Sequence, residues 1–202
     1  MTVTRVVDAD RPDPEVLDAA AAVLTSGGTV AFPTESFYGL GADALSREAV
    51  RRVFRIKGRP EAKPLLVLVD SMERALALAA EASPGARELM ARHWPGPLTL
   101  VLRAAPTVPI EVTAGSGTVG VRVPGHAVAL GLVRAAGVPV TAPSANLSGA
   151  APPTRAGEVA ASLGSAVDFI LDGGVTAGGS GSTLADCTVW PPRILRQGSI
   201  RL

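Results

Sequence analysis

The chain of 202 residues is long enough to bury one well-packed core, and its 47% hydrophobic and 18% charged residues are typical of a globular protein. The formal net charge of +1 argues against a general nucleic-acid coat protein, and the single cysteine excludes an intrachain disulfide and a cysteine-based zinc site. The N-terminus lacks a signal-peptide pattern and no apolar run is long enough to cross a bilayer, so we expect a soluble, cytoplasmic protein without a membrane partner.

Capping residues and glycines predict where the helices begin and end. Asp13-Pro14-Glu15 begins the first helix, because a capping carboxylate, a proline in the first turn and an acid near the positive end of the dipole occur together. Gly27-Gly28 ends that helix. Ser46 is expected to cap the second helix. The later helices are predicted at residues 72–81, 84–92, 127–136 and 154–163.

Short apolar or alternating runs predict the strands. Polar residues 107–117 and glycine-rich residues 172–181 are predicted to be loops. Helices and strands mix without strict alternation, and no linker or repeat divides the chain. We therefore predict an α/β fold with a mixed β-sheet, formed by a single domain over residues 1–202. The strands are expected at residues 29–32, 65–69, 98–102, 118–123, 138–140, 169–171, 182–189 and 193–195, with an edge strand within residues 1–12.

The stretch from Thr141 to Gly149 places polar groups directly after the predicted strand at residues 138–140. Open α/β sheets bind ligands just past the ends of their strands. Ser144 and Asn146 can bond either to the local backbone or to a bound anion. An ordinary turn rich in serine and asparagine explains the same residues, so this stretch indicates a ligand site only together with other segments.

Lys57, Arg59 and Lys63 are predicted to lie in one basic loop between a helix and a strand. Neighbouring cations repel one another unless an anion joins them, and both arginine and lysine suit phosphate. A glycine and two prolines fix this loop, which favours anion binding over the alternative of a solvated charged loop. The glycine-rich residues 178–183 offer backbone amides that suit a phosphate, although a flexible loop explains them equally.

No covalent nucleophile is evident in the sequence. Walker A and Gly-x-Ser-x-Gly patterns are absent, and no pair of carboxylates is placed for acid–base catalysis. Cys187 lies in a predicted strand and is expected to be a core residue, and His93 is expected to be structural or exposed. The hydroxyls, amides and cations instead suit phosphate chemistry, in which positioning and charge neutralisation supply most of the catalysis.

Several segments, taken in order, resemble the YrdC-like family of threonylcarbamoyl-AMP synthases. Each motif is weak alone, but their number and their order are specific. The resemblance implies a twisted mixed β-sheet flanked by helices, with a concave, basic active site. The matching segments are Pro33-Thr-Glu-Ser-Phe-Tyr-Gly-Leu-Gly41, Lys57-Gly-Arg59, Lys63-Pro-Leu65, Trp94-Pro-Gly-Pro-Leu-Thr99, Gly120-Val-Arg-Val-Pro124, Ala142-Pro-Ser-Ala-Asn146, Ser148-Gly149, Ser182-Thr183 and Arg196-Gln-Gly198.

The resemblance implies a nucleotidyltransferase that joins three small substrates. L-threonine, bicarbonate or CO2, and ATP would give threonylcarbamoyl-AMP and pyrophosphate, with Mg2+ on the phosphates. The threonine amine would capture CO2 as a carbamate, whose oxygen attacks the α-phosphate without a protein nucleophile. The product would feed a downstream tRNA threonylcarbamoyl transferase complex that makes N6-threonylcarbamoyladenosine, and weak RNA binding is compatible with the sequence.

The resemblance also implies roles for individual residues. Lys57 and Arg59 match the family's Lys-x-Arg signature and are the expected catalytic residues, and Ser144 and Asn146 match its Ser-x-Asn signature. No metal ligand from the chain is expected, and Thr34 and Thr141 either support the pocket or cap turns. The expected ATP-binding residues are Lys57, Arg59, Lys63, Thr118, Ser144, Asn146 and Arg196, and the expected threonine-binding residues are Ser36, Arg122, Ala142 and Ser182, with Arg122 paired to the carboxylate.

Leu68 departs from the family pattern, in which many relatives carry a histidine that approaches threonine. A leucine cannot donate a hydrogen bond, which concerns threonine affinity more than the reaction. The chain ends just after Arg196-Gln-Gly198 and so resembles the short form of the family.

Two alternatives stay open at this point. One is a carbamoyl-adenylate-forming module like that of hydrogenase-maturation proteins, whose additional segments do not fit this length. The other is a non-catalytic RNA-binding factor, for which the low net charge and few aromatic residues give little electrostatic or stacking reach.

Overall fold

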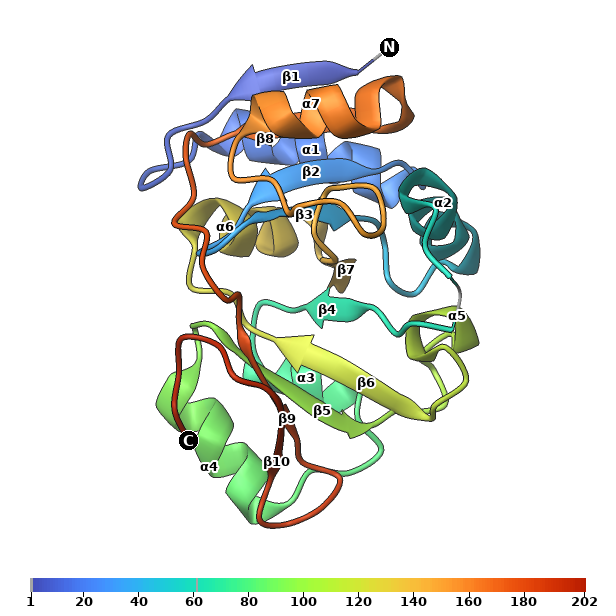
Figure 1. The fold of residues 1–202 in the computed structure, drawn as a ribbon, viewed down its shortest axis with the longest axis vertical. Coiled ribbons are helices and arrows are strands. Elements are labelled where there is room, and N and C mark those ends of the chain that lie inside the picture. The colour runs from blue at the N-terminus through green and yellow to red at the C-terminus, as the bar shows by residue number, and fades with distance from the viewer. Residues whose placement is uncertain (1, 61) are drawn as a thin grey trace.

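The computed structural model describes residues 2–60 and 62–202, so Glu61 of the predicted basic loop lies outside the described residues. Its strands form two mixed sheets, one in the upper and one in the lower half of Figure 1. The predicted α/β fold with helices around mixed strands is confirmed, but the single sheet we expected is two sheets. Isolated bridges link them, between Gly39 and Ser144 and between Asp43 and Val140.

Helices surround both sheets, and most of them begin where a capping residue predicts. Side chains of Asp13, Ser46 and Ser83 each accept a backbone N–H at the start of a helix. None of the described helices combines the length and apolar character needed to cross a bilayer. The helices are α1 Pro14–Thr25, α2 Arg47–Lys57, α3 Met72–Ala77, α4 Pro84–His93, α5 Ile110–Thr113, α6 Ala127–Ala136 and α7 Ala156–Leu163, followed by a 3-10 turn, Gly164–Ala166.

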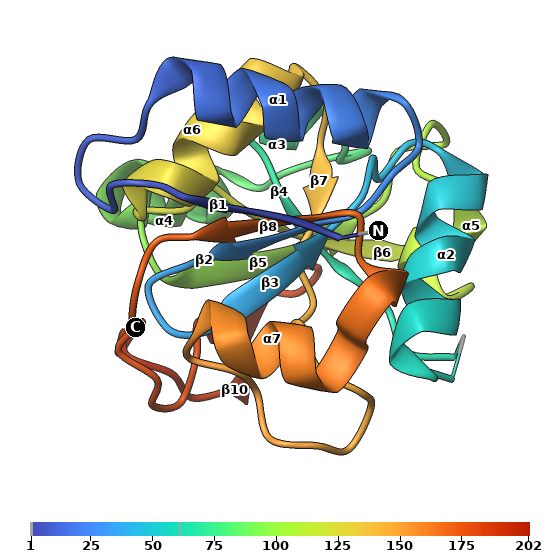
Figure 2. The same cartoon turned by 90° about the horizontal axis from the view of Figure 1, so that it is seen from above.

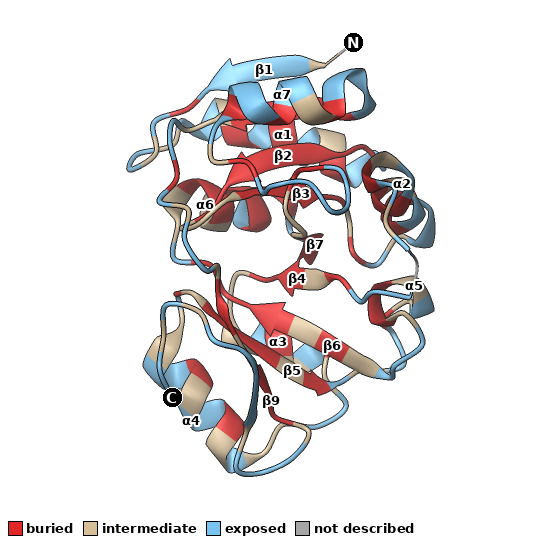
Figure 3. Cartoon of the chain, viewed as in Figure 1, coloured by how far each residue is buried: buried red, intermediate tan, exposed pale blue. Residues whose placement is uncertain are grey.

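The first sheet contains β1 (Val3–Val6), β2 (Val30–Pro33), β3 (Tyr38–Gly41) and β8 (Phe169–Asp172), in the order β1-β8-β2-β3. β1 and β2 run parallel to β8, whereas β3 runs antiparallel to β2. Every residue of β2 and β3 is buried, because α1 and α6 cover one face and α7 covers the other (Figure 2). β1 is an exposed edge strand (Figure 3).

The second sheet has the strand order β10-β9-β5-β6-β4-β7, and its pairings alternate between antiparallel and parallel. The face of β5 that carries Leu98, Leu100 and Leu102 is buried together with apolar residues of α3 and α4. The opposite face, with Thr99 and Val101, lines the site described below. The strands are β4 Leu66–Leu68, β5 Leu98–Arg103, β6 Thr118–Arg122, β7 Val140–Thr141, β9 Thr183–Asp186 and β10 Arg193–Arg196.

The structure corrects three local predictions. Helix α5 lies within residues 107–117, which we expected to be a loop, and it begins at Ile110, directly after Pro109, without a side-chain cap. Strand β3 was not predicted, because its two glycines weaken the alternating apolar pattern. Strand β9 ends at Asp186, so Cys187 follows the strand, although it is buried as expected.

Candidate active site

One face of the second sheet is the floor of a cavity of about 730 Å³. Side chains alternate along a strand, so Val119 and Val121 of β6 are buried in the core while their neighbours face the cavity. The same alternation in β4 and β5 makes the floor partly apolar and partly polar. The floor residues are Leu66, Leu68, Thr99, Val101, Thr118, Gly120, Arg122 and Leu184.

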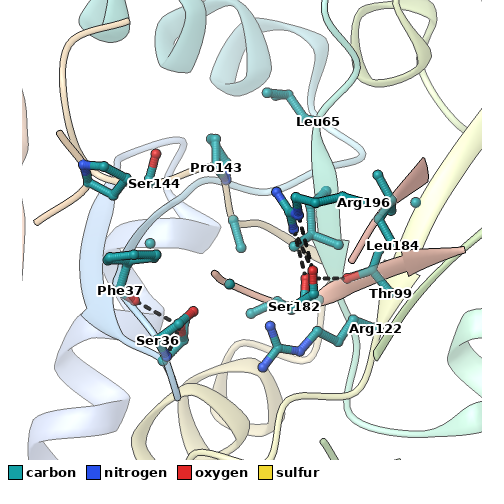
Figure 4. Close-up of a pocket in the computed structure, with 18 of the residues that line it drawn as sticks. Ser36, Phe37, Leu65, Thr99, Arg122, Pro143, Ser144, Ser182, Leu184 and Arg196 are labelled. Atoms are coloured by element: carbon teal, nitrogen blue, oxygen red, sulfur yellow. Dashed lines mark hydrogen bonds between the residues drawn. The ribbon is translucent and has the colours of Figure 1, made fainter. Parts of the chain in front are cut away.

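Loops from distant parts of the chain form the walls above this floor. The turn before β3, the residues that follow β7 and the glycine-rich loop before β9 all contribute. Figure 4 shows Ser36, Phe37 and Ser144 on one side of the cavity, and Ser182 and Arg196 on the other. The cavity therefore lies between the edge of the first sheet and the open face of the second.

Arg122 lies at the end of β6 with its side chain only 4% exposed. Its Nε donates to the carbonyl of Gly96 at 2.9 Å, and its Nη2 donates to the carboxylate of Glu35. Glu35 also accepts the backbone N–H of Gly125 at 2.6 Å. Three sequence motifs that are far apart in the chain therefore meet at one guanidinium group.

Arg59 and Arg196 also line the cavity, and neither pairs with a carboxylate among the described residues. Arg59 donates to two carbonyls of its own loop, at 3.3 and 3.0 Å, and Arg196 donates to the carbonyl of Ser182, at 3.1 and 2.9 Å. Burial lowers the pKa of both groups, and the charge of Arg122 lowers that of Arg196 further. The described lining includes these three arginines and no carboxylate, so the cavity suits an anion.

Residues 22–198 match a protein family, Sua5/YciO/YrdC, that is described as "Telomere recombination". The chain belongs to the Sua5/YciO/YrdC family. The membership that the motifs predict is therefore confirmed. The chain is 47% identical over 183 residues to threonylcarbamoyl-AMP synthase of Pyrococcus abyssi, a match that covers 91% of this chain and 54% of that protein. The chain spans about half the length of this relative and of a second one from Bacillus subtilis.

Solved structures of the Sua5/YciO/YrdC family share the fold. P. abyssi Sua5 complexed with L-threonine superposes with a TM-score of 0.96 at 44% identity, over 100% of this chain and 59% of that one. E. coli YciO superposes with a TM-score of 0.91 at 26% identity, over 100% of this chain and 98% of that one. The predicted YrdC-like fold is confirmed by these superpositions, whereas the domain bounds of residues 1–202 stay a prediction.

Most of the residues that the sequence predicts for the site line the cavity together. Lys57, Lys63 and Asn146 do not line the cavity. The lining residues that were predicted are Ser36, Arg59, Thr118, Arg122, Ala142, Ser144, Ser182 and Arg196.

Lys57 is not part of a basic loop, because it is the last residue of α2 and Gly58 ends the helix in a left-handed conformation, with φ of 56°. Its side chain is buried, and Nζ donates to the carbonyls of Ser144 and, at 2.6 Å, Asn146. The Lys57 carbonyl accepts the N–H of Ser148 at 2.7 Å. Lys57 thus stabilises the Ser-x-Asn loop through its backbone carbonyls, outside the cavity lining, while Arg59 lines the cavity.

The burial of Lys57 predicts how the free energy of unfolding depends on pH. Burial, and secondly the charge of Arg59, lower its pKa from 10.5 to about 8. Above about pH 8 the unfolded chain keeps a proton on Lys57 that the folded chain releases, so the stability contributed by this residue rises with pH up to the unfolded pKa. We expect the difference in unfolding free energy between wild type and Lys57→Met to grow by up to about 1 kcal/mol per pH unit above pH 8. Urea denaturation at several pH values measures it, and a constant difference would contradict this expectation.

Of the other predicted polar residues outside the cavity, Asn146 and Thr141 have local partners. Asn146 is buried, and its Nδ2 donates to the carbonyls of Leu147 and Ala150, at 2.9 and 2.7 Å, while its Oδ1 has no partner among the described residues. Thr141 is buried and bonds to backbone groups of Leu40 and Ala42, which fits the turn-capping alternative. Lys63 is exposed.

Thr34 lines the cavity, but its hydroxyl donates to the carbonyl of Phe37 at 2.8 Å. This bond stabilises the turn before β3 and leaves that hydroxyl without a free proton for a ligand. The turn-capping alternative therefore accounts for Thr34 as it stands in the structure.

Sequence reasoning gave no role to three residues that the structure brings into the site. Glu35 holds Arg122, Thr99 approaches the hydroxyl of Ser182 at 2.9 Å, and Gly120 leaves the centre of the floor bare. Thr99 and Gly120 could have been found from the alternation of side chains along β5 and β6. Gly120 shares a face of its strand with the predicted site residues Thr118 and Arg122, and Thr99 shares a face of its strand with the polar Arg103. Leu68 pairs in register with Arg122, so the floor beside Arg122 is apolar.

The described residues contain no group of three or more histidines, cysteines, aspartates or glutamates that could cage a metal ion. Mg2+ in nucleotide sites is commonly held by substrate phosphates and water together with few protein ligands. The cavity wall offers hydroxyl oxygens from Ser36 and Ser144 but no carboxylate in its described lining. These residues fit an ion that arrives with a triphosphate, and they do not fit a resident metal.

Proposed function

We propose that the protein is an L-threonylcarbamoyladenylate synthase, which makes threonylcarbamoyl-AMP and pyrophosphate from L-threonine, bicarbonate or CO2, and ATP. The observation that carries the proposal is a basic cavity whose described lining has three arginines and no carboxylate, in a fold shared with a relative complexed with L-threonine. Relatives at 40–47% identity named threonylcarbamoyl-AMP synthase support the same assignment.

In this proposal the chain positions its substrates and supplies no nucleophile. The threonine nitrogen forms a bond to the carbon of CO2 and loses a proton, giving a carbamate. A carbamate oxygen then bonds to the α-phosphorus as the bond to the bridging oxygen breaks, and pyrophosphate leaves with that electron pair. Arg122 binds the threonine carboxylate, and Arg59 and Arg196 stabilise the phosphate charge. Mg2+ would enter with the triphosphate and neutralise further charge.

The reaction itself is the most direct test. Purified protein should release pyrophosphate from ATP only when threonine and bicarbonate are both present, because the attacking oxygen belongs to the carbamate. Mass spectrometry should detect threonylcarbamoyl-AMP in the same mixture, and omission of either small substrate is the control. ADP as the stoichiometric product would rule out attack at the α-phosphate, and carbamoyl phosphate as the required substrate would favour the carbamoyl-adenylate alternative.

The later fate of the product belongs to the same proposal. Threonylcarbamoyl-AMP would be passed to a tRNA threonylcarbamoyl transferase complex for N6-threonylcarbamoyladenosine synthesis in the cytoplasm. Binding of the chain to RNA is not needed for this step, because the transferred group travels on a small molecule. Electrophoretic mobility shifts with tRNA would detect any such binding separately from the synthase reaction.

A further inference from the structure

Glu35 lies in the turn between β2 and β3 and does not line the cavity. Its carboxylate oxygens have separate partners: one accepts from Arg122 Nη2 and the other from the N–H of Gly125 at 2.6 Å. Burial alone would raise the pKa of Glu35, but the Arg122 charge and the hydrogen bonds outweigh it and lower the pKa. Glu35 is therefore an anion at neutral pH, and it lies behind Arg122 rather than among the residues that line the cavity.

Arg122 is fixed at two points, and its remaining donors face a different direction. An arginine has five N–H donors in one plane. The Nε–H is taken by the Gly96 carbonyl and one Nη2 proton by Glu35. The other donors, on Nη1 and Nη2, are left for the cavity that Arg122 lines, and in Figure 4 the side chain extends from the sheet toward Ser36. This free edge has the fork geometry that binds a carboxylate through two bonds.

We propose that Glu35 is a positioning residue of the amino-acid subsite, which orients the Arg122 fork so that its free edge receives the substrate carboxylate. The inference rests on the proposed function for the identity of that substrate. Glu35 also neutralises the charge of Arg122, so orientation rather than excess positive charge provides recognition at this end of the cavity. Arg59 and Arg196 have no carboxylate partner among the described residues, so they keep their charge for the phosphates.

Two substitutions test the role of Glu35. Glu35→Asp keeps the charge but shortens the side chain by one methylene, so it cannot reach Arg122 and Gly125 together. Glu35→Gln keeps the length but presents an amide in place of the second carboxylate oxygen. Small misplacements of a positioning group cost on the order of 100-fold, so we expect the threonine KM to rise about 10- to 100-fold in both variants. The ATP affinity and the kcat at saturating threonine should stay within about threefold.

Asp168→Asn is the matched control, because Asp168 pairs with Arg52 at 2.7 Å away from the cavity lining. It should lower the melting temperature without changing the threonine KM. The side-chain Nε–H signal of Arg122 in NMR spectra gives a readout without substrate: it should be protected from solvent exchange in wild type and lose protection in both Glu35 variants. If Glu35→Gln does not fold, the threonine KM and the Arg122 signal can still be measured in Glu35→Asp.

The outcomes separate the inference from the proposed function. Wild type that releases no threonine-dependent pyrophosphate overturns the proposed function, and the Arg122 signal then still decides whether Glu35 orients that side chain. Active wild type with an unchanged threonine KM in folded Glu35 variants overturns the positioning role alone. A raised threonine KM with retained kcat and ATP affinity supports it.

Discussion

Gly120→Val should abolish ATP binding while leaving the fold intact. Gly120 lies at the centre of the cavity floor, in register with Leu66 on one side and Val101 on the other. A Cβ added there would meet only the methyl group of Thr99, at 3.5 Å, which is ordinary contact. The two further methyl groups of valine would project into the cavity and fill the space that the proposed nucleotide needs above the bare backbone of Gly120. Valine also has a higher strand preference than glycine, so the substitution should not impair folding.

Calorimetric titration of ATP measures this effect. We expect a loss of affinity of about 100-fold, since overpacking costs about 1–3 kcal/mol and each 1.4 kcal/mol is tenfold. Gly120→Ala should weaken binding less, because it adds one methyl group. Gly157→Ala is the control: Gly157 lies in α7 with nothing within 4 Å of an added Cβ, and alanine should stabilise that helix without changing ATP affinity. Wild-type affinity in Gly120→Val would show that no ligand covers the floor.

Elements with strong local signals could be predicted from the sequence, and those made by long-range pairing could not. The first turn of α1 follows from Asp13-Pro14-Glu15, and α6 was predicted with its observed bounds of residues 127–136. By contrast, β3 is a strand because it pairs with β2 across a tight turn, which overrides the poor strand preference of its glycines. The division into two sheets likewise depends on contacts between distant segments.

The candidate site shows the same limit. Arg122 was predicted as a site residue from its motif, but its partner Glu35 is 87 positions away, and no spacing rule connects them. Lys57 and Arg59 are two residues apart and were given one role, yet one is the end of a helix and the other lines the cavity. Gly58 carried the local signal that separates them, because glycine commonly follows the last turn of a helix.

Lys57→Met should destabilise the protein and weaken ATP binding together. Methionine fills a similar volume but cannot donate, so the carbonyls of Ser144 and Asn146 lose the ammonium that holds them. Hydrogen bonds from a charged donor contribute about 1.5–3 kcal/mol each, and relief of the buried charge offsets part of that loss. We expect the unfolding free energy to fall by about 2–4 kcal/mol, because a buried acceptor is left unsatisfied.

Lys63→Met is the matched control for this substitution, because Lys63 is exposed and its change should move stability by no more than about 0.5 kcal/mol. Urea denaturation of the ligand-free proteins gives the stability difference, and calorimetry gives the ATP affinity. If Lys57 instead served as a phosphate ligand, Lys57→Met would weaken ATP binding with stability unchanged or raised, since an unpaired buried charge would be removed. A joint loss of both indicates that Lys57 acts on the nucleotide through the loop that carries Ser144.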